Sequence, residues 1–138
     1  MQLGNRTGRV ACVAQASRGE GGVRVTRLSV AADIGRIVNR DLARQQIEGG
    51  LVYGMSLALG SAIGFRRGLP TASRLASLNL PTLADSPEIA IDFVGSSADP
   101  FDPGELGTVV AAPAIANALA SATGQRSRRL PLDAATGQ

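Results

Sequence analysis

The stretch Pro103-Gly104-Glu105-Leu106-Gly107-Thr108 places an acidic residue between two glycines, directly before a run of small apolar residues from Val109 to Ala122. The run predicts an Ala-rich buried helix that ends at Gly124, a residue suited to a helix C-cap. A carboxylate at the beginning of such a helix has two interpretations. It is a first-turn acid that suits the helix dipole, or a general base on a turn that a substrate or cofactor can approach closely. Local sequence leaves both open, although acidic first turns are common.

Upstream of this stretch, three segments predict strands. Residues 10–16 and 23–30 are short β-branched runs on either side of a glycine-rich turn, which predicts a hairpin. In the second run, alternation places Val25 and Leu28 on opposite faces. Residues 87–94 alternate apolar and polar side chains and predict a further strand.

A second helix is predicted to open at Arg40, after Asn39 as its N-cap. Its residues are apolar all round after Gly49, so we expect the second half of this helix to be buried on every side. Two amides and a carboxylate lie in its first half, and they form a solvated turn or line a ligand site. They are Gln45, Gln46 and Glu48.

The remaining segments are short. Residues 61–72 predict a strand entering a turn, residues 129–132 predict a last short strand, and residues 133–138 form a polar tail. Together these elements predict an α+β fold, in which a short mixed or antiparallel sheet carries two buried helices. A length of 138 residues favours a single domain over residues 1–138.

Composition narrows the class of function. The chain is 44% hydrophobic but only 3% aromatic, so its core must consist of Ala, Leu, Val and Ile. The net charge of +3 comes from fourteen arginines spread along the chain, with no lysine. A nucleic-acid-binding module would gather such charges on one face beside aromatic side chains. That function is therefore the less favoured alternative, and no nucleic-acid partner is expected.

The residue types available for chemistry are few. The chain has no histidine, which excludes His-dependent nucleophilic machinery and zinc sites of the usual kind. Cys12 is the only cysteine and lies in an apolar run, so it predicts an inert thiol and no intrachain disulfide. We predict no side-chain metal ligands. Chemistry must depend on carboxylates, backbone groups or a cofactor.

Two features of the sequence bear on location. The N-terminus lacks the apolar core of a signal peptide. The apolar stretch 51–65, about fifteen residues, is shorter than the roughly twenty that cross a bilayer. We expect no membrane span and a cytoplasmic location, or a periplasmic one if an upstream partner carries an export signal.

Several spaced motifs resemble the C-terminal molybdopterin-binding region of the xanthine dehydrogenase and aldehyde oxidase superfamily. Within that superfamily, residues 8–132 most resemble the large (beta) subunit of isoquinoline 1-oxidoreductase-type enzymes. The motifs, in chain order, are Val38-Asn39, Gln46-Ile47-Glu48-Gly49-Gly50-Leu51-Val52-Tyr53-Gly54-Met55, Ser86-Pro87-Glu88-Ile89, Gly104 to Thr108, Pro113 to Ala118, and Ala122 to Arg126 with Leu130-Pro131-Leu132.

The resemblance implies roles for four residues. Glu105 corresponds to the family's active-site glutamate, the base that takes a proton from a molybdenum-bound hydroxide during hydroxylation of an N-heterocycle or aldehyde. Gln46 corresponds to a glutamine that hydrogen-bonds the pterin cofactor. Gly104 and Gly107, on either side of the base, would let the cofactor come near the backbone. The implied cofactor is a molybdenum-pterin, as molybdopterin or its cytosine dinucleotide form.

The sequence also departs from the family pattern. Leu106, Val109 and Val110 stand where the family usually has prolines. The family's molybdenum subunit is several times longer, so the chain resembles only its final domain. The resemblance implies that the remaining molybdenum-domain segments and an iron–sulfur subunit are partners, that the chain is inactive without them, and that the isolated chain self-associates through uncovered surface. The alternative within the family is a truncated, non-catalytic remnant.

Overall fold

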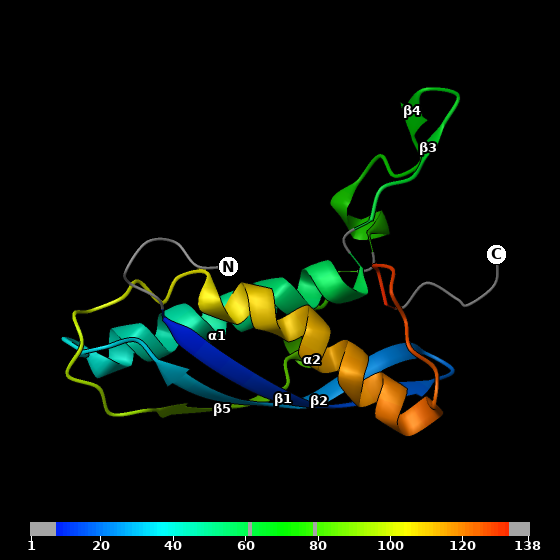
Figure 1. Cartoon of the computed structure of the whole chain (residues 1–138). Coiled ribbons are helices and arrows are strands. Elements are labelled where there is room, and N and C mark those ends of the chain that lie inside the picture. The colour runs from blue at the N-terminus through cyan, green and yellow to red at the C-terminus, as the bar shows by residue number, and fades with distance from the viewer. Residues whose placement is uncertain (1–7, 61, 79, 133–138) are drawn as a thin grey trace.

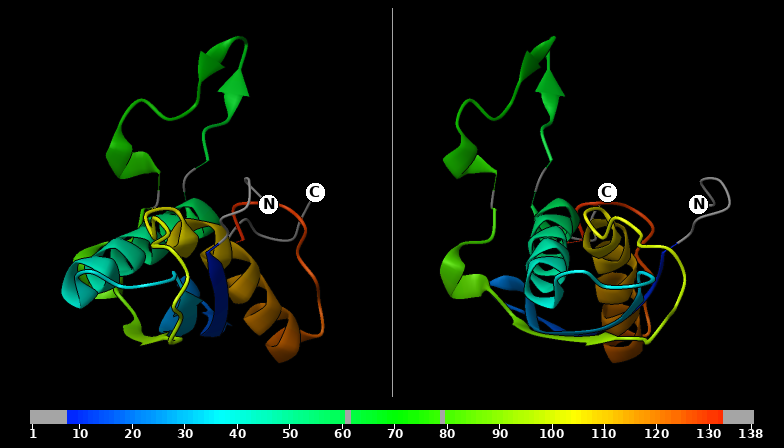
Figure 2. Two further views of the ribbon diagram at one scale, coloured as in Figure 1. Left: turned by 60° about the vertical axis from the view of Figure 1, so that its left-hand side comes forward. Right: turned by 90° about the vertical axis from the view of Figure 1, so that its left-hand side faces the viewer.

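A three-stranded sheet with both long helices on one of its faces forms the body of the molecule (Figures 1 and 2). This computed structural model describes residues 8–60, 62–78 and 80–132. The elements of the body are β1 (Arg9–Gly19), β2 (Gly22–Asp33), α1 (Arg40–Leu59), β5 (Glu88–Phe93) and α2 (Leu106–Thr123). The predicted α+β fold with a small sheet and two helices is confirmed.

The sheet has the order β1-β2-β5 and is mixed. β1 and β2 form the predicted antiparallel hairpin, whereas β5 pairs in parallel with β2. The parallel pairing requires a crossover connection, and α1 lies in that connection. At the far end of the sheet, the Arg40 guanidinium lies 5.1 Å from the centre of the Phe93 ring, so a cation–π contact joins the beginning of α1 to β5.

The predicted assignment of β2 side chains to the two faces of the sheet is wrong, because the strand contains a β-bulge. Gln15 pairs with Arg27 but Ala16 pairs with Val25, so Thr26 is an extra residue on β2. Such an insertion changes the phase of the alternation. Val25 and Leu28 are therefore both buried, although strict alternation placed them on opposite faces.

The core lies between the sheet and the two helices. It is built from aliphatic residues as the composition predicted, and its largest fully buried side chains are Leu28, Ile47, Leu51, Met55 and Ile115. Cys12 packs at the edge of this core, where burial raises the pKa of its thiol above the usual value. A raised pKa keeps the thiol protonated and unreactive at neutral pH.

Helix α1 begins as predicted. Asn39 is its N-cap, and its side-chain oxygen accepts hydrogen bonds from the backbone N–H groups of Asp41 (3.1 Å) and Leu42 (3.0 Å). The second half is not buried on every side, because the sheet and α2 cover only part of its circumference. Tyr53 is 61% exposed, and Val52 and Leu57 are exposed as well.

Helix α2 packs against α1 and β1, and Gly124 ends it with a left-handed conformation (φ 72°), as predicted. The prediction that this helix is buried holds for one side only. Its buried residues are Gly107, Ala111, Ala114, Ile115 and Leu119. Its other side reaches solvent because no further element of the described chain covers it.

Among the described residues, α2 is the one helix that is long and apolar enough to cross a membrane by length and composition. A core helix of a soluble protein meets the same criterion. The expected absence of a membrane span stays a prediction.

The chain between α1 and β5 forms an extension with short elements: β3 (Phe65–Arg66), β4 (Leu69–Pro70), and the 3₁₀ turns η1 (Leu75–Ser77) and η2 (Leu83–Asp85). The predicted strand entering a turn is confirmed as β3.

The prediction of a strand over residues 129–132 is wrong. This segment lies beside the end of α1, where the backbone N–H of Leu132 donates to the carbonyl of Ala58 at 2.6 Å. Pro131 has no N–H to donate to a strand ladder. The predicted tail, residues 133–138, lies outside the described residues.

The two helices cross at glycines, and this contact leaves no space for side chains. A Cβ added at Gly107 would meet the carbonyl of Ile47 and would lie 2.6 Å from the backbone nitrogen of Leu51. A Cβ added at Gly54 would lie 2.6 Å from the carbonyl oxygen of Thr108. Because these neighbours are backbone atoms, neither helix can yield by changing a rotamer.

We expect Gly107→Ala to lower the free energy of unfolding by about 1–3 kcal/mol, because the methyl group would force the helices apart. Gly49→Ala is the matched control, since a Cβ there meets nothing within 4 Å. The control should stabilise α1 by about 0.5–1 kcal/mol. Denaturant unfolding measures both variants, and equal stabilities would contradict the packing described for Gly107.

Candidate functional site

An open groove lies where residues 45–53 of α1 face the beginning of α2. It has a volume of about 360 Å³ and is lined by Gln45, Gln46, Gly49, Gly50, Tyr53, Gly104 and Thr108. The α1 residues recur at helical spacing, so they share one side of that helix. The other wall comes from the loop before α2 and from its first turn.

The glycine crossing sets the width of the groove. A Cβ at Gly50 would lie 3.2 Å from the Cα of Gly107, which shows how closely the backbones approach. The Thr108 hydroxyl adds a polar link, since it donates to the carbonyl of Gly50 at 3.3 Å. The two walls are therefore held at a fixed separation.

This arrangement brings two of the four predicted site residues together. The side-chain oxygen of Gln46 lies 3.8 Å from the position that a Cβ on Gly104 would take. Gly104 itself is held by Asp102, whose carboxylate accepts its backbone N–H at 2.9 Å. A side chain at position 104 would therefore fill the space between Asp102 and Gln46.

Glu105 follows Gly104 directly and occupies the N-cap position of α2. It is exposed and makes no capping hydrogen bond with its side chain. The turn before α2 is closed, because the Leu106 N–H donates to the carbonyl of Pro103 at 3.1 Å. The backbone of Glu105 thus lies on a closed turn next to Gly104, whereas its side chain is not among those that line the groove and makes no capping hydrogen bond.

Gly107 does not line the groove. Because Gly107 has no side chain, the backbone of α1 lies directly against it and fills the space around its Cα. Its predicted contact with a cofactor stays a prediction, and its observed role is in helix packing.

The groove also contains residues without a predicted role. The sequence predicts Gln45 as part of a solvated turn or a ligand site, whereas it predicts no site role for Tyr53 and Thr108. The helical spacing from Gln46 through Gly50 to Tyr53 could have identified the first wall, and Thr108 lies one helical turn beyond Gly104 on the other. Glu48 is not among the lining residues.

The donor set suits a polar, flat heterocyclic ligand. Amide, hydroxyl and phenol groups can both donate and accept hydrogen bonds, and the glycines leave space for a ring to lie against the backbone. Among the described residues, no group of three or more His, Cys, Asp or Glu side chains is placed to hold a metal ion.

Comparison with known proteins gives sequence relatives over most of the chain. One relative is the membrane-bound aldehyde dehydrogenase [pyrroloquinoline-quinone] of Gluconacetobacter polyoxogenes, to which the chain is 37% identical over 123 residues. The matched region makes up 88% of this chain and 16% of that protein. The chain is 31% identical over 122 residues to the isoquinoline 1-oxidoreductase subunit beta of Brevundimonas diminuta, with the same two shares. The chain thus spans about one sixth of the length of these relatives.

The fold also matches a solved structure. Quinoline 2-oxidoreductase from Pseudomonas putida 86 superposes with a TM-score of 0.71 at 21% identity, covering 79% of this chain and 15% of that one. At this identity the match establishes the fold.

The family model described as the molybdopterin cofactor-binding domain matches residues 5–87, more than half of the chain. The sequence motifs, the fold and this match agree. The chain belongs to the molybdopterin cofactor-binding domain family of the xanthine dehydrogenase superfamily.

Proposed function

We propose that this chain is the C-terminal cofactor-binding part of a molybdenum hydroxylase. The observation that carries the proposal is the meeting of Gln46 with the Gly104-Glu105 turn across a groove of polar groups and glycines. Gln46 comes from α1 and Gly104 from the loop before α2, and the crossing of the two helices at Gly107 brings them together. Family membership supplies the class of cofactor.

Each residue has a defined task in this proposal. The Gln46 amide hydrogen-bonds the pterin edge, and Gly104 lets that edge lie against the backbone. The Glu105 carboxylate accepts the proton that water loses as its oxygen passes to the substrate, which is general-base catalysis. When bound, the molybdenum-pterin cofactor supplies the two-electron redox chemistry.

The groove supplies only part of the site, because it is open to solvent and the chain spans about one sixth of its relatives. We propose that the remaining molybdenum-domain segments complete it and that an iron–sulfur subunit carries the electrons away. The subunit name of the isoquinoline relative shows that this relative works in an assembly.

Substrate, cofactor form and location belong to the same proposal. The names of the relatives favour an aromatic N-heterocycle or an aldehyde as substrate. The cofactor is molybdopterin or its cytosine dinucleotide form. The location is cytoplasmic, or periplasmic where a partner supplies the export signal.

In the assembled enzyme, we expect Glu105→Gln to lower turnover by about 10²-fold or more, because the amide cannot accept the proton. Molybdenum and pterin content should stay at the wild-type level, since Glu105 is assigned no role in holding the cofactor. Steady-state kinetics and metal analysis measure the two quantities.

Glu48→Gln is the control, because it makes the same chemical change on α1 at a residue to which the proposal assigns no role. Wild-type turnover in the Glu105 variant would overturn the general-base assignment. A wild-type assembly that carries full molybdenum but does not turn over would identify the chain as part of a non-catalytic remnant.

The isolated chain should purify without stoichiometric molybdenum, because one open wall does not retain the cofactor. Mass spectrometry of the metal content and fluorescence of released pterin test this expectation. One molybdenum per chain would show that the described groove is sufficient by itself.

Release of pyrroloquinoline-quinone from the assembled enzyme would contradict the proposed cofactor class.

A further inference from the structure

An arm of residues 62–78 extends from the end of α1 and stands away from the rest of the molecule (Figures 1 and 2). It carries the β3–β4 hairpin. Three of its large apolar side chains are highly exposed, namely Phe65 at 74%, Leu69 at 70% and Leu75 at 75%. The arm therefore displays apolar side chains without adding them to the core.

The arm does not hold its own structure by packing. Its hairpin consists of two pairs, Phe65 with Pro70 and Arg66 with Leu69. A two-stranded hairpin of this kind is marginally stable in water without a surface to pack on. The pairing of Leu69 with Arg66 and of Phe65 with Pro70 places Phe65 and Leu69 on opposite faces of the hairpin, so both faces offer an exposed apolar side chain to a partner.

The charge of the arm is of one sign. Arg66, Arg67 and Arg74 lie in it, and residues 62–78 contain no Asp or Glu. A complementary surface must therefore offer carboxylates around apolar contacts.

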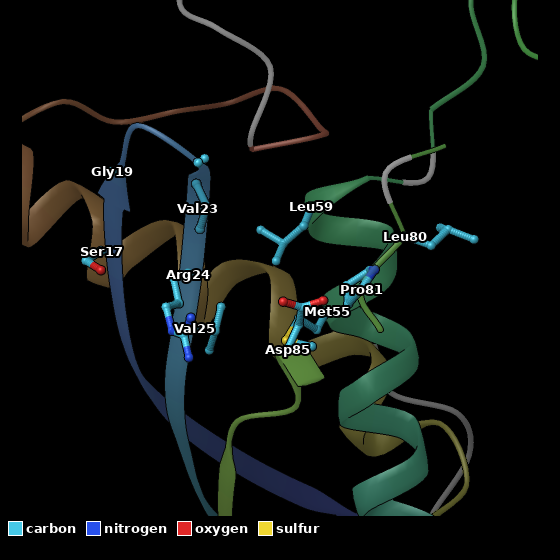
Figure 3. A pocket seen from close by; sticks show the side chains of 12 residues that line it. Ser17, Gly19, Val23, Arg24, Val25, Met55, Leu59, Leu80, Pro81 and Asp85 are labelled. Atoms are coloured by element: carbon cyan, nitrogen blue, oxygen red, sulfur yellow. The ribbon is translucent and has the colours of Figure 1, made fainter. Parts of the chain in front are cut away.

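A second feature lies at the root of the arm. A pocket of about 400 Å³ opens between the hairpin end of the sheet and the last turns of α1, with Leu80 and Pro81 of the returning chain on its side (Figure 3). Its lining includes the buried side chains of Val25, Met55 and Leu59.

The rim of this pocket carries both charges. Arg24 and Asp85 line it. Hydrogen bonds from the backbone and hydroxyl of Thr82, and then the charge of Arg24, lower the pKa of the Asp85 carboxyl. The pocket thus combines an apolar interior with an ionised rim, which suits an apolar side chain carried on a polypeptide.

The pocket and the groove use successive parts of α1. The groove is lined by α1 residues from Gln45 to Tyr53, and the pocket is lined by Met55 and Leu59. The two linings share no residue, so a partner that fills the pocket does not occupy the groove.

We propose that the arm and the pocket at its root form one docking surface for the polypeptide that makes up the rest of the molybdenum protein. The proposal rests on the proposed function. The relatives place about five sixths of the protein outside this chain, so the occupant is present in every assembled molecule. Its docking segment carries carboxylates and inserts an apolar side chain into the pocket.

The test places a photo-crosslinking amino acid at position 69 in the assembled protein and maps the crosslinked peptides. We expect them to come from the molybdenum polypeptide outside residues 1–138. Combining Arg66→Glu with Arg74→Glu should lower the crosslink yield at least tenfold. Combining Arg128→Glu with Arg129→Glu, an equal charge change on exposed residues elsewhere, should change it less than twofold.

The arm variants should keep the thermal midpoint of the isolated chain, because their side chains are exposed, and this measurement shows that folding is intact. Crosslinks to a second copy of this chain, to nucleic acid or to lipid would overturn the proposal, as would a yield unaffected by the arm charges. Cofactor analysis of the same sample tests the proposed function separately. Crosslinks to the outside polypeptide in a protein without molybdenum would leave docking supported and the proposed function refuted.

Discussion

The close crossing of α1 and α2 at Gly107 and Gly54 is the constraint on which the rest of the structure depends. Because only hydrogen atoms stand between the two backbones at these positions, the helix axes approach to a distance that side chains would prevent. The same crossing brings Gln46 to Gly104 and defines the groove. Packing and the candidate site therefore share one cause.

Two successive parts of α1 contribute to different sites. Residues 45–53 present amides, glycines and Tyr53 to the groove, whereas Met55 and Leu59 line a pocket at the root of the arm. The exposed side of α2 and the exposed Tyr53 belong to the same pattern, since apolar and aromatic surface is left uncovered. A domain that forms one wall of a larger protein has this distribution of surface.

The departures from the family pattern concern the helix start, and the structure limits their effect. Leu106 closes the turn through its backbone N–H, and Val109 is 61% exposed, so neither residue disturbs the crossing. The placement of Glu105 depends on this turn and on the packing of Gly107 behind it. Helix α2 therefore begins at Leu106 without a proline at positions 106, 109 or 110.

Sequence alone predicted the three strands of the main sheet, both long helices, and the Asn39 and Gly124 caps, because periodicity and capping are local properties, but it also predicted a strand over residues 129–132 that does not form. It could not determine the faces of β2, since the bulge at Thr26 depends on pairing with β1. Nor could it show that the backbone of α1 packs directly on Gly107, or that Tyr53 and Thr108 line the groove with Gln46. Contacts between distant segments depend on how the helices cross, and that crossing is decided only when the core packs.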